Sequence, residues 1–73
     1  MNTAGADRAP PQPFEVDGST YKVKCLGAGY DGIQGREKWE LLLQVGVSWK
    51  REAHCYLEPG ATEAQAKERL AGV

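Results

Sequence analysis

The chain has 73 residues, the length of one small domain, and 41% of them are hydrophobic. Its 9 lysines and arginines against 10 aspartates and glutamates give a formal net charge of −1, so no overall positive field draws the molecule to nucleic acid or anionic lipid. The sequence has no apolar run long enough to span a membrane and no apolar stretch of the signal-peptide kind near its first residue. We therefore expect a cytoplasmic protein without a membrane partner.

Residues 1–13 differ in composition from the rest of the chain. Their only apolar residues are alanines and one methionine, and Pro10, Pro11 and Pro13 lack the backbone N–H that helices and strands use. The sequence predicts a disordered tail over residues 1–13 and a single folded domain over 14–73. A domain of about 60 residues has a core that is only marginally sufficient, so a partner or a second copy of the chain, as a homo-oligomer, is expected to add stability.

Asp17-Gly18 predicts the first hairpin, because both central positions of a type I′ turn need positive φ. A two-residue loop there pairs Val16 with Ser19. The apolar side chains of the two strands then share one face, namely Phe14, Val16, Tyr21, Val23 and Cys25.

Two alternating stretches, 39–45 and 47–57, predict two further strands that join at Gly46. A loop with an odd number of residues pairs Leu43 with Trp49 and keeps both apolar rows on one face, whereas an even loop places Trp49 opposite Gln44 or Leu42. We expect the odd loop, which puts both Trp39 and Trp49 in the core. The run 41–43 of three leucines breaks the alternation, which indicates a central strand or an apolar spot on the outer face.

The last element is a helix from Thr62 to Leu70. Thr62 followed by Gln65 fits a capping box, and Gly72 fits a C-cap. Ala66, Leu70 and Val73 form the stripe that would face the sheet. The predicted fold is α+β, a three- to four-stranded antiparallel sheet packed against one C-terminal helix, in the order ββββα.

Residues 27–32 match the glycine pattern of a dinucleotide-binding loop. That motif works only when a helix follows and points its N-terminus at the pyrophosphate, and here the chain runs on into another strand. We therefore expect no nucleotide cofactor. The segment is predicted to be a glycine-rich loop that exposes Tyr30 and Ile33 for recognition.

His54 and Cys55 are neighbours, which raises the question of a metal site or a Cys/His nucleophile. Successive strand residues point to opposite faces, so Cys55 should lie with Cys25 on the apolar face and His54 in solvent. The pattern predicts two reduced, buried thiols and no metal site. The carboxylates fall beside lysines and arginines rather than in a catalytic pair, and we expect no enzyme activity.

The outer face of the predicted sheet offers a better functional candidate. On the expected register it collects four lysines and two glutamates around apolar side chains, which resembles an apolar centre with a charged rim. We expect a small non-enzymatic binding protein that recognises a protein partner through this face and the glycine-rich loop, such as an accessory or inhibitor protein of phages and mobile elements. The expected contact residues are Lys22, Lys24, Leu26, Tyr30, Ile33, Lys38, Leu42, Gln44, Lys50, His54 and Tyr56.

Residues 38–70 carry a tryptophan strand at Trp39, a basic hairpin at Lys50-Arg51 and a threonine-capped, alanine- and glutamate-rich helix start at 62–66. In this order they resemble the N-terminal arm-binding domains of phage and transposon integrases, which are three-stranded sheets packed on a C-terminal helix. The resemblance implies sequence-specific reading of the DNA major groove by the exposed sheet face. The residues in question would be Lys22, Lys24, Lys38, Gln44, Lys50 and His54. This chain is acidic overall and has a long proline-containing tail where those domains usually begin with basic residues, so DNA binding is the alternative and a protein partner the first expectation.

Overall fold

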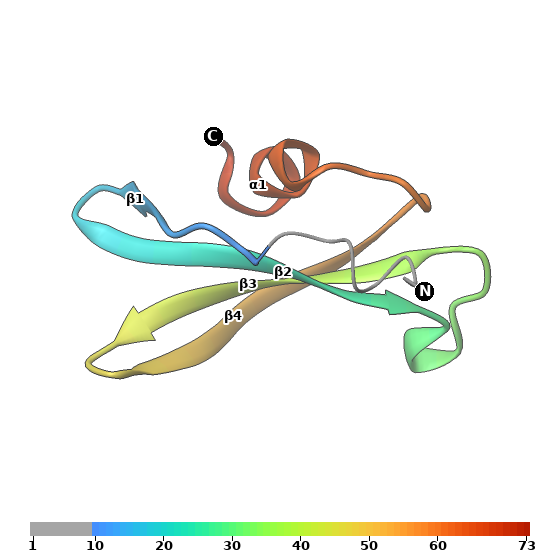
Figure 1. Ribbon diagram of the computed structural model, residues 1–73, viewed down its shortest axis with the longest axis horizontal. Helices are drawn as coiled ribbons and strands as arrows, with labels where there is room; N and C mark the ends of the chain where they lie inside the picture. Colours follow the sequence, from blue (N-terminus) through green and yellow to red (C-terminus); the bar gives the residue numbers. More distant parts are fainter. Residues whose placement is uncertain (1–9) are drawn as a thin grey trace.

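The computed structural model describes residues 10–73, which form a four-stranded antiparallel sheet with one α-helix lying across one of its faces (Figure 1). The elements are β1 (Phe14–Val16), β2 (Ser19–Ala28), the 3₁₀ turn η1 (Tyr30–Gly32), β3 (Glu37–Val45), β4 (Ser48–Leu57) and α1 (Glu63–Ala71). The strands follow one another across the sheet in chain order. This confirms the predicted α+β fold.

Most of the predicted tail, residues 1–9, lies outside the described residues. In residues 10–13, the backbone N–H of Gln12 donates a hydrogen bond to Oε2 of Glu63 at 3.2 Å, at the first residue of α1. Among residues 10–73 no helix has the length and apolarity that crossing a bilayer requires.

The first hairpin has the predicted turn and register. Asp17 and Gly18 adopt φ values of 50° and 84°, the left-handed conformation that a type I′ turn requires at both central positions. Val16 pairs with Ser19 and Phe14 with Tyr21. The Asp-Gly signal therefore fixes the pairing of β1 with β2.

The second hairpin differs from the prediction. Its loop has two residues, Gly46 and Val47, so Val45 pairs with Ser48 and Gln44 with Trp49. Gly46 has φ of 63°, and Val47 is not among the positive-φ residues, which is the pattern of a type II′ turn with glycine at its first central position. The expected odd loop is wrong, because this glycine makes the shorter turn accessible.

A β-bulge in β4 then returns the apolar residues of that strand to the helix side. Leu42 pairs with Arg51 but Leu41 pairs with Ala53, so Glu52 is an extra residue on β4. One extra residue reverses the alternation of faces. Beyond the bulge, Ala53 joins the residues packed against the core, whereas Trp49, before it, lies on the opposite face. The expectation that Trp49 is a core residue is therefore wrong.

The core lies between the sheet and α1. Its buried members are Val23, Trp39, Leu41 and Ala66. Ala66 has no exposed surface, and its small side chain allows the helix to approach the sheet closely. Partly buried side chains surround these four: Phe14, Tyr21, Cys25, Ala53, Cys55, Leu57, Leu70 and Ala71. Leu70 packs as predicted, but Val73 is exposed, because Gly72 adopts a left-handed conformation that ends the helix before it.

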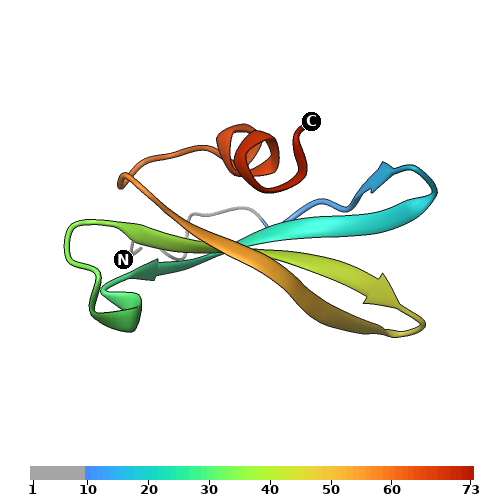
Figure 2. The same ribbon diagram turned by 180° about the vertical axis from the view of Figure 1, so that it is seen from behind.

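Local sequence signals determine both ends of α1. The backbone N–H of Gln65 donates to Oγ1 of Thr62 at 3.1 Å, and the backbone N–H of Thr62 donates to Oε1 of Gln65 at 2.8 Å. This is the predicted capping box. Gly72, with φ of 75°, is the predicted C-cap. The view from behind shows α1 on one side of the sheet and η1 on the other (Figure 2).

The two tryptophans give a direct test of this register. Trp39 is 3% exposed, so Trp39→Ala should lower the free energy of unfolding by about 3–5 kcal/mol, a loss large enough to unfold a small domain. Trp49 lies on the uncovered face, and Trp49→Ala should cost roughly 1 kcal/mol or less. Urea denaturation of both variants measures the difference, and equal large losses would show that Trp49 belongs to the core.

Candidate binding surface

The face of the sheet opposite α1, called the outer face below, presents side chains from three strands. Lys22 and Lys24 come from β2, and they pair with Leu42 and Glu40 of β3. The face contains Lys22, Lys24, Lys38, Glu40, Leu42, Gln44, Trp49, Arg51, His54 and Tyr56, by alternation along each strand and by the pairing of the strands. Among residues 10–73, no strand or α-helix covers this face, and η1 meets it at one end (Figures 1 and 2).

The outer face carries an apolar and an aromatic side chain toward the β3–β4 turn. Leu42 and Trp49 are both half-buried, and they lie on neighbouring strands. The ammonium of Lys22 reaches across β3 to lie 4.2 Å from the centre of the Trp49 ring, within the range of a cation–π contact. We call Lys22, Leu42 and Trp49 the central patch. Trp49 is a member that the predicted register excluded.

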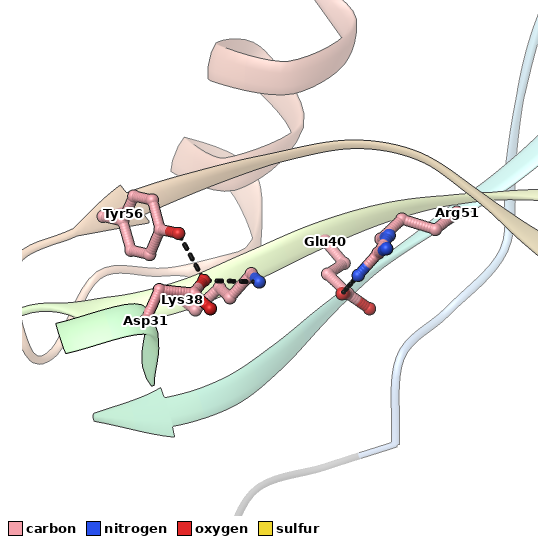
Figure 3. Close-up of polar contacts among 5 residues, drawn as sticks. All are labelled: Asp31, Lys38, Glu40, Arg51 and Tyr56. Atoms are coloured by element: carbon pink, nitrogen blue, oxygen red, sulfur yellow. Dashed lines mark hydrogen bonds and ion pairs between the residues drawn. The ribbon is translucent and has the colours of Figure 1, made fainter. Parts of the chain in front are cut away.

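Two of the cations on the outer face are neutralised there. Arg51 Nη1 lies 3.1 Å from Oε2 of Glu40, and Lys38 Nζ lies 2.6 Å from Oδ2 of Asp31 (Figure 3). Lys38 is only 7% exposed, although it was expected to be a free rim lysine. Its burial follows from the glycine-rich loop, which brings Asp31 over it.

Lys50 does not lie on the outer face, and that expectation is wrong. The two-residue turn places Lys50 opposite Leu43, on the same side of the sheet as α1. It remains exposed, with Glu52 as its nearest carboxylate at 3.9 Å. Arg51 takes the outward position that the odd loop would have given to Lys50.

Asp31 joins the glycine-rich loop to the sheet. It lies in η1 with φ of 56°, a left-handed conformation that aspartate tolerates better than most residues. Its Oδ2 accepts hydrogen bonds from Nζ of Lys38 and from the hydroxyl of Tyr56, which are paired on neighbouring strands (Figure 3). We call these three residues the Asp31 latch. The ring of His54 packs edge-on against Tyr56, with 5.5 Å between the ring centres.

The latch holds the loop at one end of the outer face. Tyr30, the first residue of η1, and Ile33, which follows η1, are exposed as predicted. Gly29 and Gly32 have φ of 81° and 76°, which allows the chain to turn tightly on both sides of Asp31. The loop and the outer face therefore form one continuous surface.

The other expected contact residues are distributed as follows. Gln44 and His54 are exposed on the outer face, and Tyr56 is half-buried there by the latch. Leu26 is half-buried at a second bulge, between Cys25 and Gly27 of β2. Sequence reasoning missed Trp49, Arg51 and Asp31. The glycine at the first position of a two-residue turn was a usable signal for Trp49 and Arg51, whereas no local pattern marks Asp31 as the partner of Lys38.

Cys25 and Cys55 both pair with Trp39, one from each side. They are therefore two strand spacings apart, about 9.5 Å, which exceeds the Cα separation of about 6.8 Å at which a disulfide can form. Burial raises the pKa of the Cys55 thiol, with Arg69 acting in the opposite direction. The thiols are half-buried rather than buried, and the predicted reduced state fits this geometry.

Among residues 10–73, no three His, Cys, Asp or Glu side chains come together as a metal site. No family model, curated protein or solved structure matches this chain.

Removing the charge of Asp31 should release the loop. In Asp31→Asn, Lys38 keeps its buried position but loses its carboxylate partner, so amides 29–36 should exchange hydrogen faster while those of β2 and β3 stay protected. Asp17→Asn is the matched control, because Asp17 is also a left-handed aspartate, with φ of 50°, but lies in the distant first turn. Equal exchange of the loop in both variants would show that the latch does not hold it.

The hydrogen bonds of the Asp31 latch should be lost at both low and high pH. The hydrogen bonds that Lys38 and Tyr56 donate lower the pKa of Asp31 below its usual 3.8. The ionised carboxylate therefore stabilises the latch above pH 3.8, and this stabilisation is lost as the pH falls through the lowered pKa. The hydrogen bond to Asp31 raises the pKa of Lys38 above 10.5 and that of Tyr56 above 10.0, so their contribution is lost as the pH rises through those raised values. The hydrogen-exchange protection factors of amides 29–36 should be constant between these limits, and a loss of this protection near neutral pH would contradict the assignment.

Proposed function

We propose that this protein is a small non-enzymatic binding protein that recognises a protein partner through its outer face and its glycine-rich loop. The supporting observation is the position of Leu42 and Trp49, which lie half-buried on neighbouring strands of a sheet face that α1 leaves uncovered. Exposed polar side chains surround them, from Lys24 on β2 to Gln44 and Arg51. An aromatic and apolar centre inside a polar rim is the usual arrangement of a protein-binding surface.

The loop adds to this surface. The Asp31 latch fixes η1 beside the outer face, with Tyr30 and Ile33 exposed. A loop that is already ordered loses less conformational entropy when a partner binds. Tyr30 and Ile33 are therefore proposed as contact residues at one end of the outer face, with Trp49 toward the other end, beside the β3–β4 turn.

The distribution of charge favours a protein over DNA. Binding to the DNA backbone depends on cations that are free to contact phosphates. Of the four cations of the outer face, Lys38 and Arg51 are already paired with Asp31 and Glu40. The alternative, an integrase-like module that reads DNA with the same face, would have to rely on Lys22 and Lys24, with Gln44 and His54 as base-reading side chains.

The proposal can be tested by affinity capture from lysates of the source cells, with and without nuclease treatment. Leu42→Ala and Trp49→Ala should each reduce capture of the partner by about ten-fold or more, because they remove the apolar centre. Val47→Ala is the matched control, since Val47 is 99% exposed at the β3–β4 turn and lies off the outer face. Each variant is first checked by circular dichroism to be folded at the temperature of the capture.

Two outcomes would contradict the proposal. Equal capture by the Leu42 and Val47 variants would show that the outer face is not the contact surface. Loss of binding on nuclease treatment, together with a steep salt dependence that Lys22→Ala and Lys24→Ala reduce, would favour the DNA-binding alternative.

A further inference from the structure

The unpaired positive charge of the outer face lies on one strand. Arg51 of β4 is paired with Glu40 at 3.1 Å, and Lys38 of β3 with Asp31 at 2.6 Å. Lys22 and Lys24 of β2 have no carboxylate partner within 4.0 Å among residues 10–73. Glu40, which lies opposite Lys24, is already bound to Arg51. The outer face is therefore polarised, with free cations along β2 and neutral ion pairs along β3 and β4.

Lys22 places one of these free charges beside the apolar and aromatic side chains of the outer face. Its ammonium lies 4.2 Å from the centre of the Trp49 ring, whereas Lys24 is exposed farther along the same strand. An anionic group that approaches Lys22 therefore comes within reach of Trp49 and Leu42. A binding partner that complements this arrangement needs negative charge beside apolar surface.

We propose that the partner presents an acidic protein segment, with carboxylates opposite Lys22 and Lys24 and an apolar side chain against Leu42 and Trp49. This inference rests on the proposed function and specifies the chemistry of the partner. A second copy of this chain is a poor occupant of the same face, because two outer faces would bring four unpaired lysines together.

Synthetic peptides provide the probe. Three ten-residue peptides share alternate leucines and carry glutamate, glutamine or lysine at the remaining positions. Each is titrated into the full-length protein at low ionic strength, while the amide signals of Lys22 and Leu42 and the indole signal of Trp49 are followed by NMR. The glutamate peptide should bind about ten-fold more tightly than the glutamine peptide, and the lysine peptide should not bind.

Two variants separate local charge from overall charge. The double variant Lys22→Gln/Lys24→Gln should bind the glutamate and glutamine peptides equally. Lys50→Gln removes an exposed lysine on the other side of the sheet and should leave the ten-fold preference intact. A preference lost equally in Lys50→Gln would show a general charge effect and overturn the assignment to β2.

The remaining outcomes distinguish this inference from the proposed function. Equal binding of the glutamate and glutamine peptides to the unmodified protein, with shifts at Leu42 and Trp49, would overturn the acidic partner and leave the outer face as a binding surface. Absence of shifts on the outer face with every peptide would count against both. Displacement of the glutamate peptide by duplex DNA, with a steep salt dependence, would identify the anion as nucleic acid and overturn the protein partner.

Discussion

One short helix covers one face of a four-stranded sheet, and the rest of the molecule follows from this constraint. The side chains of a strand alternate between the two faces of the sheet. When one strand residue packs under Ala66, the residues before and after it in the sequence therefore point to the opposite face. Val23 and Trp39 pack toward α1, and Lys22 and Lys38 consequently lie on the outer face. Since α1 is the one α-helix among residues 10–73, it cannot cover both sides. The outer face is therefore left uncovered, and we propose it as the surface that meets a partner.

The parts of the fold with a local chemical cause could be predicted from the sequence. Asp17-Gly18 specifies its turn through positive φ, and the capping box of Thr62 and Gln65 specifies the start of α1 through two hydrogen bonds. The second hairpin depends on packing between β4 and the core under α1, which is not a local interaction. The bulge at Glu52 interrupts the ladder, but it brings Ala53 and the alternate residues after it under the helix. The residues 50–52 carry no pattern that distinguishes a bulge from a continuous strand, so the prediction placed Trp49 in the core.

The change of face along β4, which the two-residue turn and the bulge cause, explains which residues of the candidate surface were predicted correctly. The residues of β3, and those of β2 before its bulge at Leu26, kept their expected faces, so Lys22, Lys24, Leu42 and Gln44 lie where the alternation placed them. On β4, Arg51 replaced Lys50, and Trp49 joined Leu42 on the outer face. The ion pair of Lys38 could not be predicted without the conformation of the loop, because only a folded η1 brings the carboxylate of Asp31 onto the buried ammonium of Lys38. The result is a surface with a more aromatic centre and fewer free cations than the sequence indicated, which strengthens the case for a protein partner.

Site-specific photo-crosslinking in the source cells tests the central claim most directly. A benzophenone amino acid at Gln44, an exposed position of the outer face, is compared with the same amino acid at Glu68, an exposed position of α1. The account predicts that irradiation yields a discrete, protease-sensitive and nuclease-resistant adduct from position 44 and none from position 68. An adduct from position 68 alone would place the partner on the helix side and contradict the account.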